Sequence, residues 1–213
     1  MKLHLALLGM ALIGQQAVAQ EVLQSVVTPH ALLAPEQIEL KNDAFVDGGG
    51  QAYLQLGFVE GEKAGVWVKV PEAIDRFKVD SFRILIGSSQ VELANTQIFF
   101  TMAVGPEPVN NVPGMIENAA SVTPGPYWND VPAMGDGNNL PCAVGGQFVG
   151  AAVEFTHSGA PSVYRDLDGL SDVKKNSLFA IPGGWNYSVA YGLRGDWILR
   201  VVGHKATAEE CGA

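Results

Sequence analysis

The side chains best suited to chemistry lie in one acidic loop, DLDGLSD at residues 166–172. Carboxylates two positions apart, with a glycine that permits a sharp turn, can place several hard oxygen atoms around Ca²⁺. Asp166, Asp168 and Asp172 are therefore candidate calcium ligands, although the loop lacks the full ligand set and flanking helices of an EF-hand. The alternative is a solvated turn in which Asp166 pairs with Arg165 or caps backbone amides.

A second group of polar side chains surrounds His157, which ends an alternating segment just before that loop. Catalysis by this chain would require Glu154, His157 and Asp166 as general acid and base groups. A serine nucleophile is not indicated, because Ser158 directly follows His157 and would point to the other face, and the chain has no Gly-x-Ser-x-Gly elbow. A histidine that hydrogen-bonds the following loop is the simpler interpretation, so no catalytic residue is assigned.

Aromatic residues are the candidates for ligand contact. Trp67 alternates with Val66 and Val68, so if the valines face the core, the indole should point outward. Tyr127 and Trp128 lie in a long segment rich in proline and glycine, residues 105–146, where a ring is either buried or part of a binding surface. Trp67, Trp128 and Tyr127 are predicted to contact a ligand; the alternative is that the tryptophans lie under the long loop.

A further set of side chains shares one face of a predicted strand over residues 185–191: Trp185, Tyr187, Val189 and Tyr191. An exposed aromatic face would be a platform on which sugar rings could stack. The usual alternation in a β-sandwich instead places such an aromatic face in the core, and the small residues at the intervening positions then face the solvent. The second interpretation is favoured.

These residues are positioned by strands, because apolar side chains recur at every second position in many parts of the chain. The clearest runs cover residues 52–60, 66–70, 76–87, 96–104 and 147–157, and shorter ones cover 177–181, 185–191 and 197–202. No amphipathic helix of convincing length is present. The pattern predicts an all-β fold, an antiparallel β-sandwich or jelly roll of roughly nine to ten strands with one long Pro/Gly-rich loop.

The predicted organisation has four parts. Residues 1–19 have the lysine, short apolar run and small residues Ala17 and Ala19 of a secretory signal peptide cleaved after Ala19. Residues 20–50 form an N-terminal segment with one edge strand, residues 51–203 the β-sandwich domain, and residues 204–213 a surface tail. The apolar run is too short to span a bilayer. No membrane insertion is expected once the signal peptide has been removed.

Charge and cysteine content indicate the compartment and the partners. The formal net charge of −9 disfavours nucleic acid as a partner, because acidic surfaces repel phosphate. The two cysteines, Cys142 and Cys211, are predicted to form a disulfide, as expected of a secreted or periplasmic protein. The alternative is a pair of free thiols.

Three segments together carry a resemblance to known proteins: GFVEGE at 57–62 leading to Val66-Trp67, VEFTHSG at 153–159 through Asp168-Gly169, and GLRGDWILR at 192–200. They resemble secreted bacterial β-sandwich modules of mostly uncharacterised function, over roughly residues 51–203. The resemblance implies export and a jelly-roll-like fold, and it implies no specific activity.

Three functions are compatible with this sequence. The leading hypothesis is a non-catalytic extracellular module that binds a glycan, a surface or a protein through loops and spare aromatic residues. The second is a small extracellular polysaccharide hydrolase or lyase. The third is a structural subunit of a surface layer or filament, assembled by pairing of edge strands. No cofactor other than the candidate calcium ion is indicated.

Overall fold

A computed structural model describes residues 21–28, 32–46, 48–88, 97–112, 115–123, 125, 127–133 and 142–212 of the chain. The predicted signal peptide, residues 1–19, lies outside these ranges. The described residues form strands β1 to β13 and three short 3₁₀ helices, η1 to η3. Within the same ranges, no helix has the length and apolar character needed to cross a membrane.

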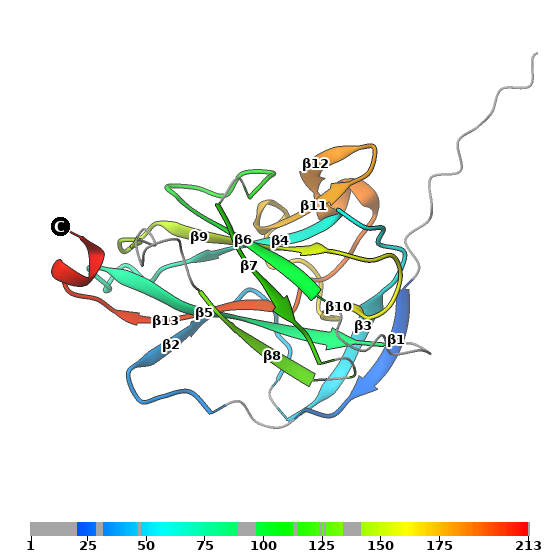
Figure 1. Cartoon of the computed structure of the whole chain (residues 1–213), viewed down its shortest axis with the longest axis horizontal. Helices are drawn as coiled ribbons and strands as arrows, with labels where there is room; N and C mark the ends of the chain where they lie inside the picture. The colour runs from blue at the N-terminus through cyan, green and yellow to red at the C-terminus, as the bar shows by residue number, and fades with distance from the viewer. Residues whose placement is uncertain are drawn as a thin grey trace, which may run out of the picture.

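The strands form two antiparallel sheets, shown one above the other in Figure 1. Along the seven-stranded sheet the order is β1 (Glu21–Val26), β3 (Gly50–Gln55), β10 (Ser162–Arg165), β5 (Phe77–Gly87), β13 (Leu199–Lys205) and β2 (Gln37–Leu40), and β8 (Tyr127–Pro132) also pairs with β5. Along the six-stranded sheet it is β12 (Gly184–Tyr187), β11 (Asn176–Ala180), β4 (Lys63–Lys69), β9 (Phe148–Phe155), β6 (Gln97–Gly105) and β7 (Met115–Ser121). The predicted all-β sandwich is confirmed.

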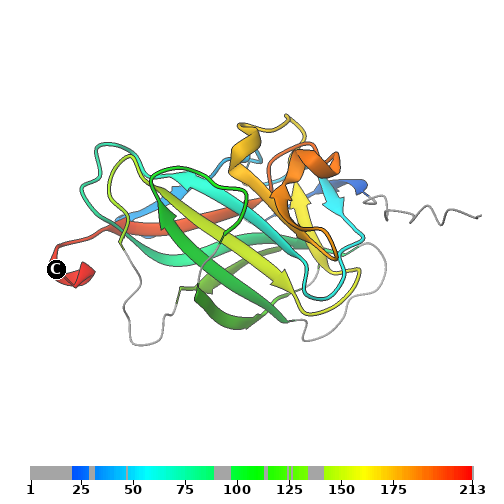
Figure 2. The ribbon, with the colours of Figure 1, turned by 90° about the horizontal axis from the view of Figure 1, so that it is seen from above.

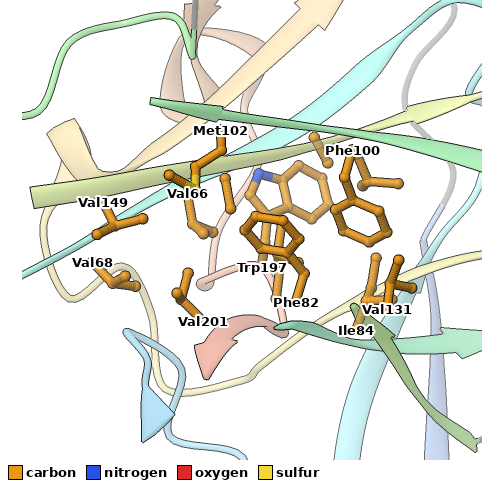
Figure 3. Close-up of a cluster of buried hydrophobic side chains, with 14 of the residues drawn as sticks. Val66, Val68, Phe82, Ile84, Phe100, Met102, Val131, Val149, Trp197 and Val201 are labelled. Atoms are coloured by element: carbon orange, nitrogen blue, oxygen red, sulfur yellow. The ribbon is translucent and has the colours of Figure 1, made fainter. Parts of the chain in front are cut away.

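The main core fills the space between the sheets and is built from the alternation seen in the sequence. Val66 and Val68 of β4 and Phe100 of β6 face Phe82 and its neighbours on β5, as Figure 3 shows. The rings of Phe82 and Phe100 stack with their centroids 5.1 Å apart. Because side chains alternate across a strand, the residues between these core positions point to the outer face of each sheet.

The N-terminal segment and the long loop contain more strands than the sequence predicted. The segment 20–50 contributes β2 as well as β1, and these strands form the two ends of the seven-stranded sheet. Residues 105–146, which were predicted as one long loop, contain β7 and also β8, which carries Tyr127 and Trp128. β8 was missed because its sequence, YWNDVP, ends in proline and shows no clear alternation; its pairing with β5 forms it.

The strand predicted over residues 185–191 is shorter in the structure. The segment 185–191 is not one strand: β12 ends at Tyr187, and the 3₁₀ helix η2 (Ser188–Tyr191) follows. The hydroxyl of Ser188, buried in this helix, accepts a hydrogen bond from Trp197 Nε1 at 3.1 Å, which draws the chain out of the sheet. Tyr191 consequently packs against the main core, whereas Val189 is exposed.

The predicted disulfide is present between Cys142 and Cys211. It fastens the 3₁₀ helix η3 (Glu209–Cys211), near the end of the described chain, to Cys142. Cys142 precedes the turn that leads into β9. The tail has other attachments, because Lys78 Nζ donates to the carbonyl of Glu210 at 3.1 Å. A disulfide fits an oxidising compartment.

Candidate functional site

The acidic loop contributes to a carboxylate cluster, but with a different third member from the predicted one. Ligand atoms of Asp166, Asp168 and Asp196 all lie within 4.8 Å of one another. Asp172 instead caps the 3₁₀ helix η1 (Val173–Lys175), accepting from Lys174 N at 2.9 Å. Asp196 was not predicted because it is distant in sequence and reaches the loop through the antiparallel contact of β10 with the chain before β13.

The cluster is held mainly by the protein's own backbone. Asp166 accepts from Ala44 N and from Asp196 N, both at 2.8 Å, and Asp196 accepts from Ser171 N at 2.8 Å. Burial, a hydrogen bond with Asp168 and the charge of Asp196 raise the pKa of Asp166 to about 7. Burial, with the charge of Asp168, also raises the pKa of Asp196. The calcium site stays a prediction, now with Asp196 in place of Asp172.

The three groups of the hydrolase hypothesis belong to separate interaction networks. Glu154 of β9 forms an ion pair with Lys63 of β4 at 2.5 Å, on the six-stranded sheet. His157 Nε2 lies 2.8 Å from the carbonyl oxygen of Pro161, so the histidine bonds the following loop as the simpler interpretation proposed. Asp166 follows β10 of the other sheet and is engaged by backbone amides. Each group therefore has a structural partner of its own.

Trp128 belongs to a packed surface outside the seven-stranded sheet. The guanidinium of Arg200 lies 4.5 Å from its ring centroid, and Phe45 meets the ring edge-on at 6.2 Å. Arg200 is fully buried and bonds Asp43 and Glu39. Trp128 is thus part of the cover over a buried ion-pair network. Its neighbour Tyr127, by contrast, has 48% of its surface exposed.

Trp67 does point away from the main core, as predicted, but it is only 2% exposed. It packs in a separate small cluster with Val112 and Ala152, and its Nε1 donates to the carbonyl of Asn111 at 3.1 Å. The indole therefore lies under residues that follow β6, which was the alternative considered for it. In this conformation the ring does not reach a ligand directly.

Next to Trp67, a row of side chains crosses the outer face of the six-stranded sheet. Strand register places Trp185 of β12 beside Phe179 of β11, Phe179 beside Lys63, Lys63 beside Glu154, and Glu154 beside Phe99 of β6. All five are partly exposed. Their strand neighbours Ala64, Leu178, Val153, Ile98 and Phe100 are in the main core, which fixes the outward direction of the row. We call these five residues the aromatic row.

The contacts within the row show what it offers a ligand. The rings of Phe179 and Trp185 lie 5.6 Å apart, and Lys63 Nζ lies 5.9 Å from the centroid of Phe179. Lys63 and Glu154 neutralise each other, so the row presents rings and hydrogen-bonding groups without net charge. With strands about 4.8 Å apart, five positions span about 19 Å. Figure 2 looks down on this side of the sandwich.

The sequence identified only part of this surface. Trp185 was noted but assigned to the core by alternation within its own strand, and Glu154 was considered only as a possible acid or base. Phe179, Lys63 and Phe99 carried no signal of their own. The row is a property of register between five strands, which no single segment reveals.

Comparison with known proteins gives no relative from which to argue. No protein-family model matches the chain. No curated protein and no solved structure matches it either.

Proposed function

We propose that this protein is an exported, non-catalytic module that binds a neutral polysaccharide chain on the outer face of its six-stranded sheet. The observation that carries the proposal is the aromatic row, in which rings flank a neutralised Lys63–Glu154 pair. Sugar rings have apolar C–H faces that pack on aromatic rings, and hydroxyl groups that bond to an ammonium or a carboxylate. A row of about 19 Å suits several linked sugars better than one.

Export is supported by the leader-like residues 1–19 and by the disulfide between Cys142 and Cys211. A binding role without catalysis is favoured because Glu154, the acidic residue of the row, is already paired with Lys63. Glycoside hydrolysis would require two carboxyl groups facing one cleft. The Asp166 cluster lies instead between β10 and the chain before β13, on the other sheet.

The proposal is tested by retention on insoluble cellulose, chitin and xylan, with the anionic polysaccharide alginate as a comparison. We expect retention on at least one neutral polymer without release of reducing ends, and none on alginate. Phe179→Ala and Trp185→Ala should each weaken binding at least about ten-fold, or 1.4 kcal/mol. Thermal melting checks that both variants remain folded.

The matched comparison is Tyr127→Ala, which removes an exposed ring from β8 on the other sheet. Tyr127 was a ligand contact in the sequence prediction and is not part of the aromatic row, so this variant separates the two assignments. Binding lost in Tyr127→Ala and kept in Phe179→Ala would contradict the proposed surface. A wild-type protein that none of the neutral polymers retains would contradict the function itself.

A further inference from the structure

Residues 106–112, which follow β6, cross the outer face of the six-stranded sheet beside the aromatic row. We call them the strap; they belong to the green loop at the top of Figure 1. Most of the strap is exposed, but Val112 is only 3% exposed and lies over Gly65 of β4. A Cβ placed on Gly65 would be 3.0 Å from a methyl group of Val112. Among described residues, the one hydrogen bond that holds the strap joins Trp67 Nε1 to Asn111 O.

The surface under Val112 is a second row across four of the same strands, two residues along from the aromatic row. Register aligns Ser177 of β11 with Gly65, Gly65 with Ala152, and Ala152 with Thr101 of β6. The two central members have no bulky side chain, so this second row is flat in its middle. Ser177 and Thr101 place a hydroxyl group on either side of these two residues.

Both hydroxyl groups are buried without a hydrogen-bond partner. Ser177 is 0% exposed and Thr101 is 4% exposed, and neither Ser177 Oγ nor Thr101 Oγ1 has a donor or acceptor in range. Ser177 Oγ points over the sheet, since it would lie 2.7 Å from a Cβ on Gly65. A buried hydroxyl without a partner destabilises a fold, so a ligand that bonded both groups of this row would remove that cost on binding.

Trp67 completes the covered surface. Its indole lies flat on Gly150 of β9, because a Cβ there would approach three ring atoms to 3.0 Å. The ring is therefore supported from below by backbone and covered from above by the strap. Removal of the strap would leave an oriented ring next to the second row.

We propose that the strap lifts from the sheet to admit a neutral sugar chain, which then bonds the hydroxyl groups of Ser177 and Thr101 and packs on Trp67. This inference rests on the proposed function and extends its surface from one row to two. Hydroxyl groups both donate and accept, which matches the hydroxyl groups of a sugar. The charges agree as well, since the neighbouring Lys63 and Glu154 neutralise each other and the second row has no ionised group.

The floor of the site is tested with Thr101→Val and Ser177→Ala, using the polymer that the wild-type protein retains. Both changes remove a hydroxyl without a partner, so the melting temperature should stay the same or rise. Affinity for the polymer should fall at least five-fold in each variant. Unchanged affinity in both variants, with Phe179→Ala still defective, would overturn this inference and leave the proposed function standing. Failure of the wild-type protein to bind would refute the proposed function first.

The movement of the strap is tested with Val112→Ala, which weakens its closure without changing the floor. A binding-competent state that is only partly populated lowers apparent affinity, so this variant should bind the polymer more tightly and faster than wild type. Its melting temperature should fall, because a buried valine is truncated. Val144→Ala, which truncates an exposed valine elsewhere, is the control and should leave binding unchanged. Equal or weaker binding by Val112→Ala would overturn the lifting strap.

Discussion

Ionisation of Asp166 should affect stability near neutral pH. Its carboxyl group faces Asp168 and Asp196, and the buried guanidinium of Arg165 is nearby. Burial is the largest cause that raises its pKa to about 7, against an ordinary value of 3.8. Between these values the folded protein holds a proton that the unfolded chain has lost. The free energy of unfolding should therefore decrease as pH rises from about 4 to about 7, at no more than about 1.4 kcal/mol per pH unit.

The measurement is urea denaturation of wild type and Asp166→Asn across this pH range. Asparagine keeps the shape and one acceptor but does not titrate, so the difference between the two slopes measures the ionisation of Asp166 together with its coupling to Asp168 and Asp196. Parallel curves would contradict the prediction. The same titration with added calcium tests the sequence prediction of a metal site, because a bound cation favours the ionised carboxylates and would remove the slope.

For individual residues, the sequence predicted the side chains that could form a site better than it predicted which of them are in contact. The acidic loop, the pairing of His157 with the loop after it and the outward direction of Trp67 all follow from local spacing. The contact of Asp166 with Asp196 and that of Lys63 with Glu154 join different strands. Neighbours across a sheet are set by register, and nothing in either segment alone encodes it.

Among the elements, β1 adds a charged contact with the sheet interior to its pairing with β3. Glu21 pairs with Arg165 of β10, which is fully buried and also donates to Gln55 at 3.1 Å. Burial lowers the pKa of Arg165, and Glu21 opposes that shift. Glu21→Gln should destabilise the protein by about 1–2 kcal/mol, less than a fully buried pair because Glu21 is 46% exposed.

Denaturation in urea measures the loss, and amide hydrogen exchange of β1 shows where it acts. Exchange at β1 should quicken more than exchange at β5, because β1 is an end strand of the sheet whereas β5 is central. Glu36→Gln, at an exposed residue on the other edge, is the matched control. A control as unstable as Glu21→Gln would show that the pair itself contributes nothing.

Strands with strict alternation were the ones that the sequence could predict. β4, β9 and β6 have core residues at every second position; the predicted ranges of β9 and β6 agree closely with the structure, and β4 begins three residues earlier than predicted, at Lys63. β2, β8 and β10 were missed because each is formed by pairing with distant strands: β2 with β13, β8 with β5, and β10 with β3 and β5. The strand predicted over 185–191 ended early because Ser188 bonds Trp197 from another part of the chain.

Across the whole molecule, the two outer faces differ in a way that bears on function. Outside the seven-stranded sheet, buried Arg83 and Arg200 are bonded to carboxylates, and the ring of Trp128, which Phe45 meets edge-on, covers Arg200. Outside the six-stranded sheet, one half is covered by a strap with few attachments and the other half bears the open aromatic row. This difference supports the ligand-binding role proposed for the outer face of the six-stranded sheet.

The disulfide between Cys142 and Cys211 acts on the molecule as a whole, because it closes a loop across 69 positions. Such a link restricts the unfolded chain far more than the folded one, where Lys78 already holds the carbonyl of Glu210. Replacing both cysteines with serine should lower the free energy of unfolding by up to about 4 kcal/mol. Retention on the polymer at low temperature should remain, since the aromatic row lies on other strands. Urea denaturation and the retention assay measure the two effects, and a variant that kept its stability or lost binding while folded would contradict this account.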